Sequence, residues 1–154
     1  MLSVDTNILL YAHDLDCPEH TAAAAFLRAH ADDAGFALCE LVLVELYVLL
    51  RNAAILARPL SPADAVATVQ AYRSNRSWSV IECADGIMSH VWRQAGGADF
   101  ARRRIFDARL ALTLQRHGVR ELATRNTSHF DGLGFDKVWD PIASAAAPTL
   151  PRRS

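Results

Sequence analysis

The chain has 154 residues, 51% of them hydrophobic, so it is long enough to form one domain with a buried core. No stretch of about 18 apolar residues is free of charges, and no secretory signal precedes Asp5, so we expect neither a membrane span nor export. Three dispersed cysteines indicate reduced thiols in a cytoplasmic protein and argue against a disulfide framework or a zinc site. The net charge of -1 gives no overall basic field for nucleic acid.

The predicted elements alternate between strand and helix along the chain. In order they are a strand at 2–4, a helix at 18–31, a strand at 36–39, helices at 41–54 and 62–73, a strand at 78–81, helices at 85–94 and 103–117, and strands at 121–124 and 137–139. Ser61 and Gly118 mark helix ends, because serine favours the N-cap and glycine the left-handed C-cap. The helix at 41–54 is apolar enough to be buried on most of its surface. Strands separated by helices predict a parallel sheet with helices on its faces.

Four polar residues stand where the apolar pattern predicts buried elements. Asp5 ends the first strand, and Glu45 interrupts the apolar run 41–50. Asp107 interrupts the apolar run 105–112, and Asn126 follows the strand at 121–124. A buried carboxylate is costly unless it is paired, hydrogen-bonded or bound to a metal. In open α/β sheets, ligands bind beyond the carboxyl ends of the strands. The four residues therefore predict one oxygen-rich site suited to Mg²⁺ or Mn²⁺.

Each of these residues also has a purely structural alternative. Asp5 could cap a helix that follows the first strand, and Glu45 could pair with Arg51 or Arg109. Asp107 could serve the dipole of its own helix.

Other polar and aromatic residues have structural alternatives too. Asn126 could cap the turn after its strand, because asparagine favours such turns. The arginines at 102–104 fit a solvated face, with phosphate contact as the second possibility. Trp78, Trp92 and Trp139 are expected in the core rather than as platforms for bases.

Four short motifs in order carry a family resemblance. They are residues 4–9 (Val-Asp-Thr-Asn-Ile-Leu), 43–52 around Glu45, 105–111 (Ile-Phe-Asp-Ala-Arg-Leu-Ala), and 123–126 (Ala-Thr-Arg-Asn) followed by Phe130. Residues 135–141 also resemble the closing strand of that family. From residue 1 to about 141 the chain resembles the PIN-domain ribonucleases, specifically VapC-type toxins of bacterial toxin–antitoxin pairs.

The resemblance implies a PIN-like three-layer α/β/α fold with a central parallel sheet. The catalytic domain would cover residues 1–141 and leave a loose tail at 142–154. Asp5, Glu45 and Asp107 fall on the three acidic positions of the family, which implies that all three are catalytic and metal-binding.

The fourth position departs from a common form of the family motif. An acid usually directly precedes the phenylalanine there, whereas this chain has His129 before Phe130. Asn126 is our expected fourth catalytic residue, and Ser128 and Asp131 remain alternatives for the fourth ligand.

The implied function is an Mg²⁺-dependent endoribonuclease, with Mn²⁺ as a possible substitute, acting as the toxin of a type II toxin–antitoxin system. The implied partners are an RNA substrate, a cognate antitoxin protein and a second copy in a homodimer, with no membrane involved. The apolar helices at 41–54 and 62–73 are expected to supply the protein contacts. RNA contacts are expected from the arginines near the site, Arg102, Arg103, Arg109 and Arg125.

Individual roles follow from metal-assisted hydrolysis. Asp5 and Asp107 would be the principal metal ligands, and Glu45, with a pKa raised by apolar surroundings, would orient the attacking water or complete the metal shell. Asn126 would hold a metal-bound water, and Asn7 would support the cluster by hydrogen bonding.

Two alternatives remain. One is a catalytically weak PIN-like module that binds RNA or a partner. The other is another Mg²⁺-dependent phosphate hydrolase of the haloacid-dehalogenase kind, although Asn7 stands where that family has its second aspartate.

Overall fold

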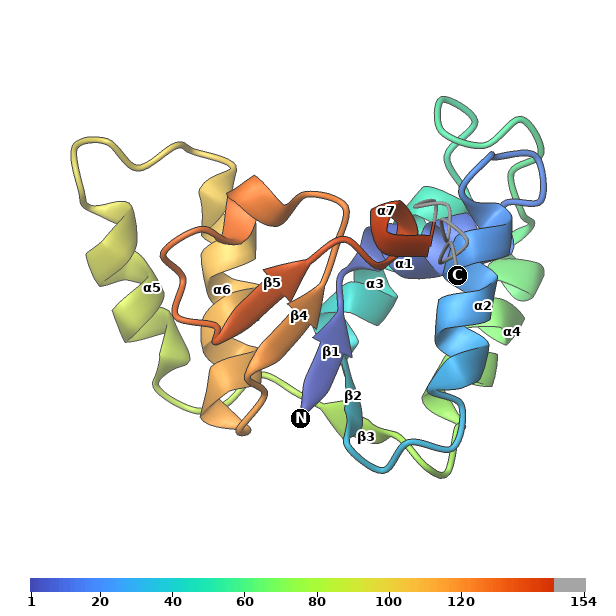
Figure 1. Cartoon of the computed structure of the whole chain (residues 1–154). Coiled ribbons are helices and arrows are strands. Elements are labelled where there is room, and N and C mark those ends of the chain that lie inside the picture. The colour runs from blue at the N-terminus through green and yellow to red at the C-terminus, as the bar shows by residue number, and fades with distance from the viewer. Residues whose placement is uncertain (146–154) are drawn as a thin grey trace, which may run out of the picture.

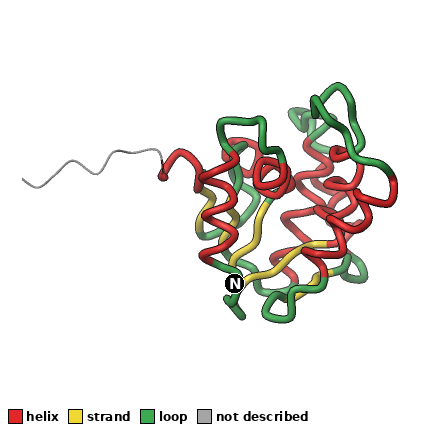
Figure 2. Tube along the Cα trace, turned by 90° about the vertical axis from the view of Figure 1, so that its right-hand side faces the viewer, coloured by secondary structure: helices red, strands yellow, loops and turns green. Residues whose placement is uncertain are grey.

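A computed structural model describes residues 1–145 of the chain. Its centre is a five-stranded sheet in which every strand pairs parallel to its neighbours, in the order β3-β2-β1-β4-β5 (Figure 1). The strands are β1 (Leu2–Val4), β2 (Phe36–Cys39), β3 (Ser79–Ile81), β4 (Glu121–Ala123) and β5 (Lys137–Trp139). Helices flank the sheet, so the predicted α/β class with a central parallel sheet is confirmed (Figure 2).

Seven α-helices and one 3₁₀ helix are formed by residues 1–145. They are α1 (Thr6–His13), α2 (His20–Ala29), α3 (Glu40–Leu50), α4 (Pro62–Arg73), α5 (Ile87–Ala95), α6 (Arg104–Arg116), η1 (Thr127–Phe130) and α7 (Pro141–Ala145). In Figure 1, α5 and α6 stand to the left of the sheet, and α2 and α4 stand to its right. The sequence pattern missed α1, because the polar residues Asp5, Thr6 and Asn7 that open it were interpreted only as a possible helix cap.

The third helix differs from its prediction in length and has one exposed face. It ends at Leu50 and not near residue 54, because Asn52 accepts a hydrogen bond from the backbone N–H of Ala54 and turns the chain. Val44 and Val48 are 60% and 56% exposed, and Glu45 is exposed beside them. The helix therefore has one exposed face, formed by these three residues, while its other residues are buried or half-buried.

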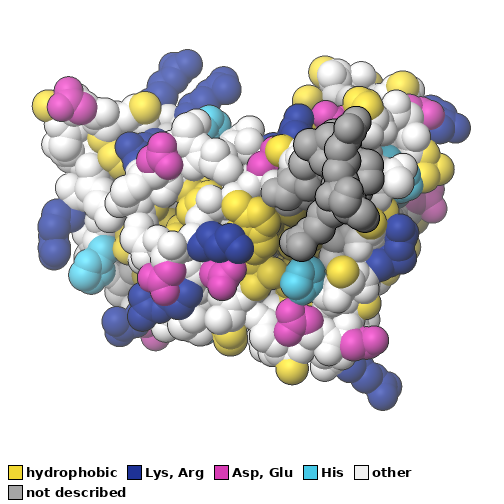
Figure 3. Space-filling model, in the orientation of Figure 1, with side chains coloured by type: hydrophobic (Ala, Val, Ile, Leu, Met, Phe, Trp, Pro, Cys, Tyr) yellow, Lys and Arg dark blue, Asp and Glu magenta, His cyan; other side chains and the backbone are white. Residues whose placement is uncertain are grey.

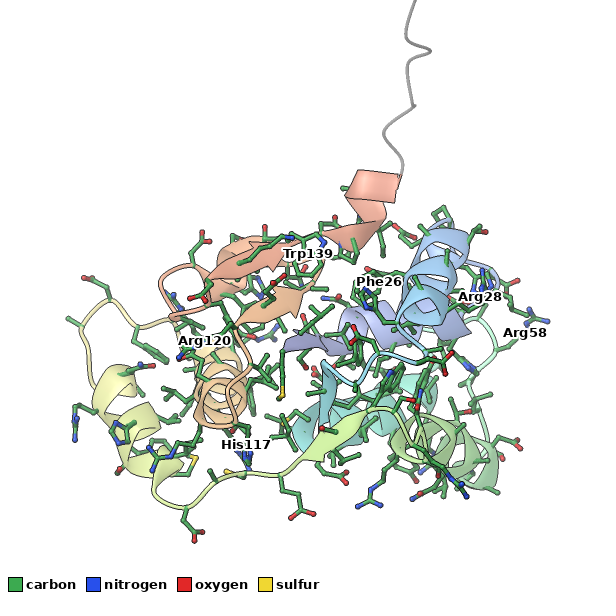
Figure 4. The ribbon with its side chains drawn as sticks, turned by 60° about the horizontal axis from the view of Figure 1, so that its bottom comes forward. Phe26, Arg28, Arg58, His117, Arg120 and Trp139 are labelled. Carbon is green, nitrogen blue, oxygen red and sulfur yellow. The ribbon has the colours of Figure 1, made fainter. Side chains whose placement is uncertain are left out.

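The core is packed between the sheet and its helices. Phe36, Leu38 and Val4 are fully buried in the central strands. At the edge of the sheet, the rings of Phe26 in α2 and Trp139 in β5 meet edge to face, with 6.3 Å between their centroids (Figure 4).

Two of the tryptophans expected in the core take different positions. Trp78 is partly buried, packs on the core and donates a hydrogen bond to the backbone oxygen of His30 at 2.7 Å. Trp92 is 60% exposed on α5, so its expected place in the core is wrong.

The chain continues beyond the predicted domain end at residue 141. Helix α7 begins at Pro141 itself and packs against α2. The rest of the predicted loose tail, residues 146–154, lies outside the described residues. None of the helices in the described part of the chain combines the length and the apolar content needed to cross a bilayer.

The register of the strands sets the geometry of the carboxyl edge of the sheet. Val4 of β1 pairs with Ala123 of β4, so the two strands end side by side. The residues that follow them, Asp5 and Thr124, therefore emerge next to each other. Since β2 lies on the other side of β1, the chain connections diverge here, which is the place where open α/β sheets bind ligands.

Candidate active site

Asp5 is held in place by three hydrogen bonds at the end of β1. Its Oδ1 accepts a hydrogen bond from the backbone N–H of Thr6 at 2.7 Å, and in this way it caps α1. Its Oδ2 accepts hydrogen bonds from the amide of Asn7 and from the hydroxyl of Thr124, both at 2.7 Å. The capping alternative for Asp5 is thus correct, but capping occupies one oxygen only and leaves the side chain on the rim of a pocket.

Thr124 links three segments of the site. It is fully buried at the end of β4, and its hydroxyl oxygen also accepts hydrogen bonds from the backbone N–H of Asn126 at 3.0 Å and from the amide of Asn7 at 3.1 Å. The amide oxygen of Asn7 in turn accepts a hydrogen bond from the backbone N–H of Arg125 at 3.2 Å. Asn7 therefore supports Asp5, as its position next to the acid predicts.

Glu45 reaches the same place from the second turn of α3. Its Oε2 accepts a hydrogen bond from the hydroxyl of Thr6 at 2.6 Å. Among the described residues neither Arg51 nor Arg109 forms an ion pair with Glu45, and Arg51 donates instead to the hydroxyl of Tyr47. The structural ion pair considered for Glu45 is therefore absent from this part of the chain. Glu45 is also exposed, so the burial expected for it is wrong, although apolar residues such as Leu41 and Val44 line the pocket with it.

Asp107 enters from the first turn of α6. Its side chain is 26% exposed, and its Oδ2 lies 3.9 Å from Nδ1 of His129. The N-cap of α6 is Arg103, whose side chain makes no capping hydrogen bond, and Asp107 lies in the first turn, as the helix-dipole alternative for it expects.

One pocket collects these residues at the carboxyl edge of the sheet. It has a volume of about 520 Å³, and its lining includes Asp5, Glu45, Asp107, Asn126 and His129. Figure 3 shows the molecule notched at its upper edge, on the side toward which the strand arrows of Figure 1 point.

The pocket narrows the choice of a fourth ligand. Ser128 and Asp131, the two alternatives to Asn126, are not among the residues that line it. The side chain of Asn126 makes no capping hydrogen bond to η1, which weakens the view that it only ends a turn.

The carboxylates in the pocket disfavour one another's charge. The pKa of Asp5 is raised, mainly by burial and further by the charges of Glu45 and Asp107, although hydrogen bonds from Thr124 and Thr6 oppose the shift. The pKa of Asp107 is raised by burial first and by Glu45 as well, with His129 and Arg104 opposing. A cation bound between them would relieve this repulsion.

The donor set fits a hydrated divalent cation. Within residues 1–145, no three side chains of His, Cys, Asp or Glu stand close enough together to form a finished metal cage. Mg²⁺ is usually bound through one or two carboxylates and keeps several of its waters, so it does not need such a cage. The pocket offers carboxylate and amide oxygens of this kind from Asp5, Glu45, Asp107 and Asn126.

Three residues of the site were not predicted as functional. Thr6 and Thr124 hold the acids through their hydroxyls, and His129 approaches Asp107. The one sequence signal that could have identified the threonines is their position, since Thr6 directly follows Asp5 and Thr124 directly follows β4. Among the arginines expected near RNA, Arg103 lines the pocket, whereas Arg125 pairs with Asp140 at 3.0 Å.

The comparisons with known proteins agree with this geometry. The PIN-domain family profile matches residues 2–135. The chain is 57% identical to Ribonuclease VapC24 of Mycobacterium tuberculosis over 144 residues, which are 94% of this chain and 99% of that protein.

Solved structures with low sequence identity share the fold. They include VapC20 of M. tuberculosis, described as a sarcin-ricin loop cleaving toxin (16% identity, TM-score 0.61, covering 79% of this chain and 87% of that one). FitAcB of Neisseria gonorrhoeae has 18% identity and a TM-score of 0.61 (92% and 98%). A toxin–antitoxin complex of Klebsiella pneumoniae has 23% identity and a TM-score of 0.56 (92% and 98%). The family profile and the identity to VapC24 show that the chain belongs to the PIN-domain family and is a relative of the VapC proteins, as the sequence motifs predict.

Proposed function

We propose that this protein is a divalent-metal-dependent endoribonuclease and the toxin of a type II toxin–antitoxin pair, acting in the cytoplasm. The observation that carries the proposal is the meeting of Asp5, Glu45 and Asp107 in one pocket at the carboxyl ends of β1 and β4. The identity of 57% to Ribonuclease VapC24 supports RNA as the substrate.

The proposed roles follow from the place of each side chain in the pocket and from its contacts. Asp5 and Asp107 would hold Mg²⁺, or Mn²⁺ in its place, directly or through water. When bound, such an ion lowers the pKa of a water ligand and offsets charge on the phosphoryl oxygens. Glu45, oriented by the hydroxyl of Thr6, would accept the proton of the attacking water. Asn126 would position a water through its amide oxygen.

The test is cleavage of RNA by purified protein. We expect cleavage in Mg²⁺, none in EDTA, and a loss of at least about 100-fold in Asp107→Asn, because positioned acid–base and ligand groups contribute rate factors of this size. Asp99→Asn, on an exposed loop residue that does not line the pocket, is the matched control and should retain activity. Equal cleavage by wild type and Asp107→Asn would overturn the proposal.

The same experiment separates the alternative functions. A binding module without activity would leave RNA intact in every metal. A phosphate hydrolase of the haloacid-dehalogenase kind would hydrolyse a generic phosphomonoester, which we expect to stay intact here.

We also propose a protein antitoxin as a partner. The similar Klebsiella pneumoniae structure is a toxin–antitoxin complex. Leu41, Val44 and Phe106 give the acidic pocket an apolar border that an antitoxin segment could cover. Purification together with the product of a neighbouring short reading frame should yield a complex without ribonuclease activity. A neighbouring protein that leaves cleavage unchanged at saturating concentration would contradict this partner.

A homodimer is the third part of the proposal. Val48 on α3 and Val66 on α4 are about half exposed, on the helices expected to supply protein contacts. Mass measurement in solution should give a dimer at micromolar concentration, and Val48→Asp should shift it toward the monomer. Wild-type protein that remains a monomer at this concentration would contradict the dimer.

A further inference from the structure

One face of α6 brings an aromatic and a basic side chain to the acidic pocket. Arg103, Phe106, Asp107 and Leu110 all line the pocket. Their spacing of three, four and seven residues places them on the same side of a helix. The backbone N–H of Phe106 donates a hydrogen bond to the oxygen of Arg103 at 3.3 Å, which fixes one residue above the other.

The ring of Phe106 is largely exposed at the pocket. It is 66% exposed, although it stands next to the half-buried Asp107. In the part of the chain that the structure describes, its ring makes no contact with another aromatic ring. A flat apolar surface is therefore free beside the proposed reaction centre. Leu110, which is 5% exposed, lies one turn further along the same face of the helix.

Arg103 is the basic residue best placed to attract a phosphate. It is exposed, and it is the one Lys or Arg among the described residues that line the pocket. Its neighbour Arg104 instead donates a hydrogen bond to the backbone oxygen of Asp131. No ion pair of the described residues includes Arg103, so its guanidinium is available to a ligand. The carboxylates opposite repel a phosphate, which makes this cation important for binding RNA.

We infer that Phe106 and Arg103 form a nucleotide subsite, in which Phe106 stacks on an unpaired base and Arg103 binds the adjoining phosphate. The inference rests on the proposed ribonuclease function and names the form of RNA that this site takes. A base within a duplex is already stacked, so the subsite selects single strands and loops. The volume of about 520 Å³ lies within the range of pockets that hold a small organic ligand.

The test is the binding of short labelled oligo(A) in EDTA, where binding is measured without metal-dependent cleavage. Phe106→Ala and Phe106→Leu should each weaken binding by about tenfold, because stacking on one aromatic ring has an effect of this size. Phe106→Trp should retain binding and show fluorescence quenching beyond that of the wild type. Trp92→Ala is the matched control, since Trp92 is similarly exposed but does not line the pocket.

The role of Arg103 is measured by salt dependence. Arg103→Ala should lower the slope of log affinity against log salt by about 0.7, the value for one phosphate contact on a single strand. Arg76→Ala, which removes an exposed arginine outside the pocket lining, should leave this slope unchanged.

The outcomes separate this inference from the proposed function. If wild-type protein cleaves RNA but Phe106→Ala and Phe106→Leu bind oligo(A) as tightly as wild type, the subsite is wrong and the ribonuclease stands. An equal effect of Phe106→Ala on a duplex of the same length would also overturn it. Loss of antitoxin binding with unchanged RNA binding would assign Phe106 to the protein interface instead. If no RNA is cleaved in any metal, the proposed function itself fails.

Discussion

The hydroxyl of Thr124 donates a hydrogen bond to Oδ2 of Asp5 at 2.7 Å across 119 residues of sequence. It joins the ends of two paired strands, since Val4 and Ala123 directly before them are in register. The bond fixes the orientation of the acid before any ligand arrives. Groups that orient metal ligands in this way commonly change metal affinity or activity by about 10- to 100-fold when they are removed.

Thr124→Val should therefore lower both stability and activity. The substitution removes one of the three hydrogen bonds to the carboxylate of Asp5, and it leaves the backbone N–H of Asn126 without its bond to the Thr124 hydroxyl. A hydrogen bond to a charged group contributes about 1.5–3 kcal/mol, so the free energy of unfolding should fall by about this amount. Cleavage should fall by about 10- to 100-fold. Urea denaturation and metal-dependent RNA cleavage measure the two effects, and Thr124→Ser should restore most of both.

A second buried threonine provides the control for this prediction. Thr113 in α6 is 1% exposed, and its hydroxyl donates to the backbone oxygen of Arg109 at 2.7 Å, away from the pocket. Thr113→Val should leave the cleavage rate of the folded protein unchanged. A wild-type cleavage rate in Thr124→Val would show that Asp5 does not need this bond.

The raised pKa values predict how stability depends on pH in the absence of metal. A carboxyl group whose folded pKa lies above its unfolded value contributes stability below about pH 4, and this contribution is lost as pH rises through the folded pKa. Burial raises the pKa of Asp107 in this way. In EDTA, Asp107→Asn should therefore gain stability relative to wild type as pH rises from about 4 to 7.

Urea denaturation of both proteins across this pH range is the measurement. Asp33 contributes to stability with the opposite sign, because its hydrogen bond from His30 lowers its pKa. Its contribution to the stability of the folded protein is present above its usual pKa and is lost as pH falls. Asp33 is unchanged in both proteins, and the difference between them isolates Asp107. Saturating Mg²⁺ should shift the difference in favour of wild type. A difference that does not change with pH in EDTA would contradict the role of burial.

The sequence located much of this architecture because the apolar pattern and the acids that interrupt it are local signals. All five strands and the sites of Asp5 and Asp107 follow from such signals. Glu45 was found by the same rule although its premise is wrong, since the residue is exposed on α3. Thr6 and Thr124 were missed because their roles depend on strand register and on hydrogen bonds between distant segments. A threonine after a strand carries no local sign of such a bond.

Thr6 provides a further prediction through its bond to Glu45. Thr6→Val removes the donor that holds Oε2 of Glu45 at 2.6 Å. Since the carboxylate keeps its charge, we expect metal affinity to change little and the cleavage rate to fall by about tenfold, at the low end of effects of orienting groups. Titration of Mg²⁺ against the cleavage rate separates the two quantities. Thr6→Ser, which keeps the hydroxyl, should cleave at nearly the wild-type rate. A large loss of metal affinity with an unchanged maximal rate would instead make Glu45 chiefly a ligand.

Mg²⁺ affinity should change when charge is placed on either of the two candidate residues for the fourth ligand that line the pocket. Asn126 and His129 line it, whereas Ser128 and Asp131 do not. A neutral amide attracts a divalent ion less than a carboxylate does, so Asn126→Ala should weaken Mg²⁺ binding only a few-fold, by about 1 kcal/mol or less. Asn126→Asp and His129→Asp should each tighten it, and each should lower stability in EDTA because it adds negative charge to a pocket that already holds three acids. Calorimetry with Mg²⁺ measures the affinity, and Ser128→Ala and Asp131→Ala serve as controls. If Mg²⁺ binding is weaker in Ser128→Ala or Asp131→Ala but unchanged in Asn126→Ala, the fourth ligand is Ser128 or Asp131 and not Asn126.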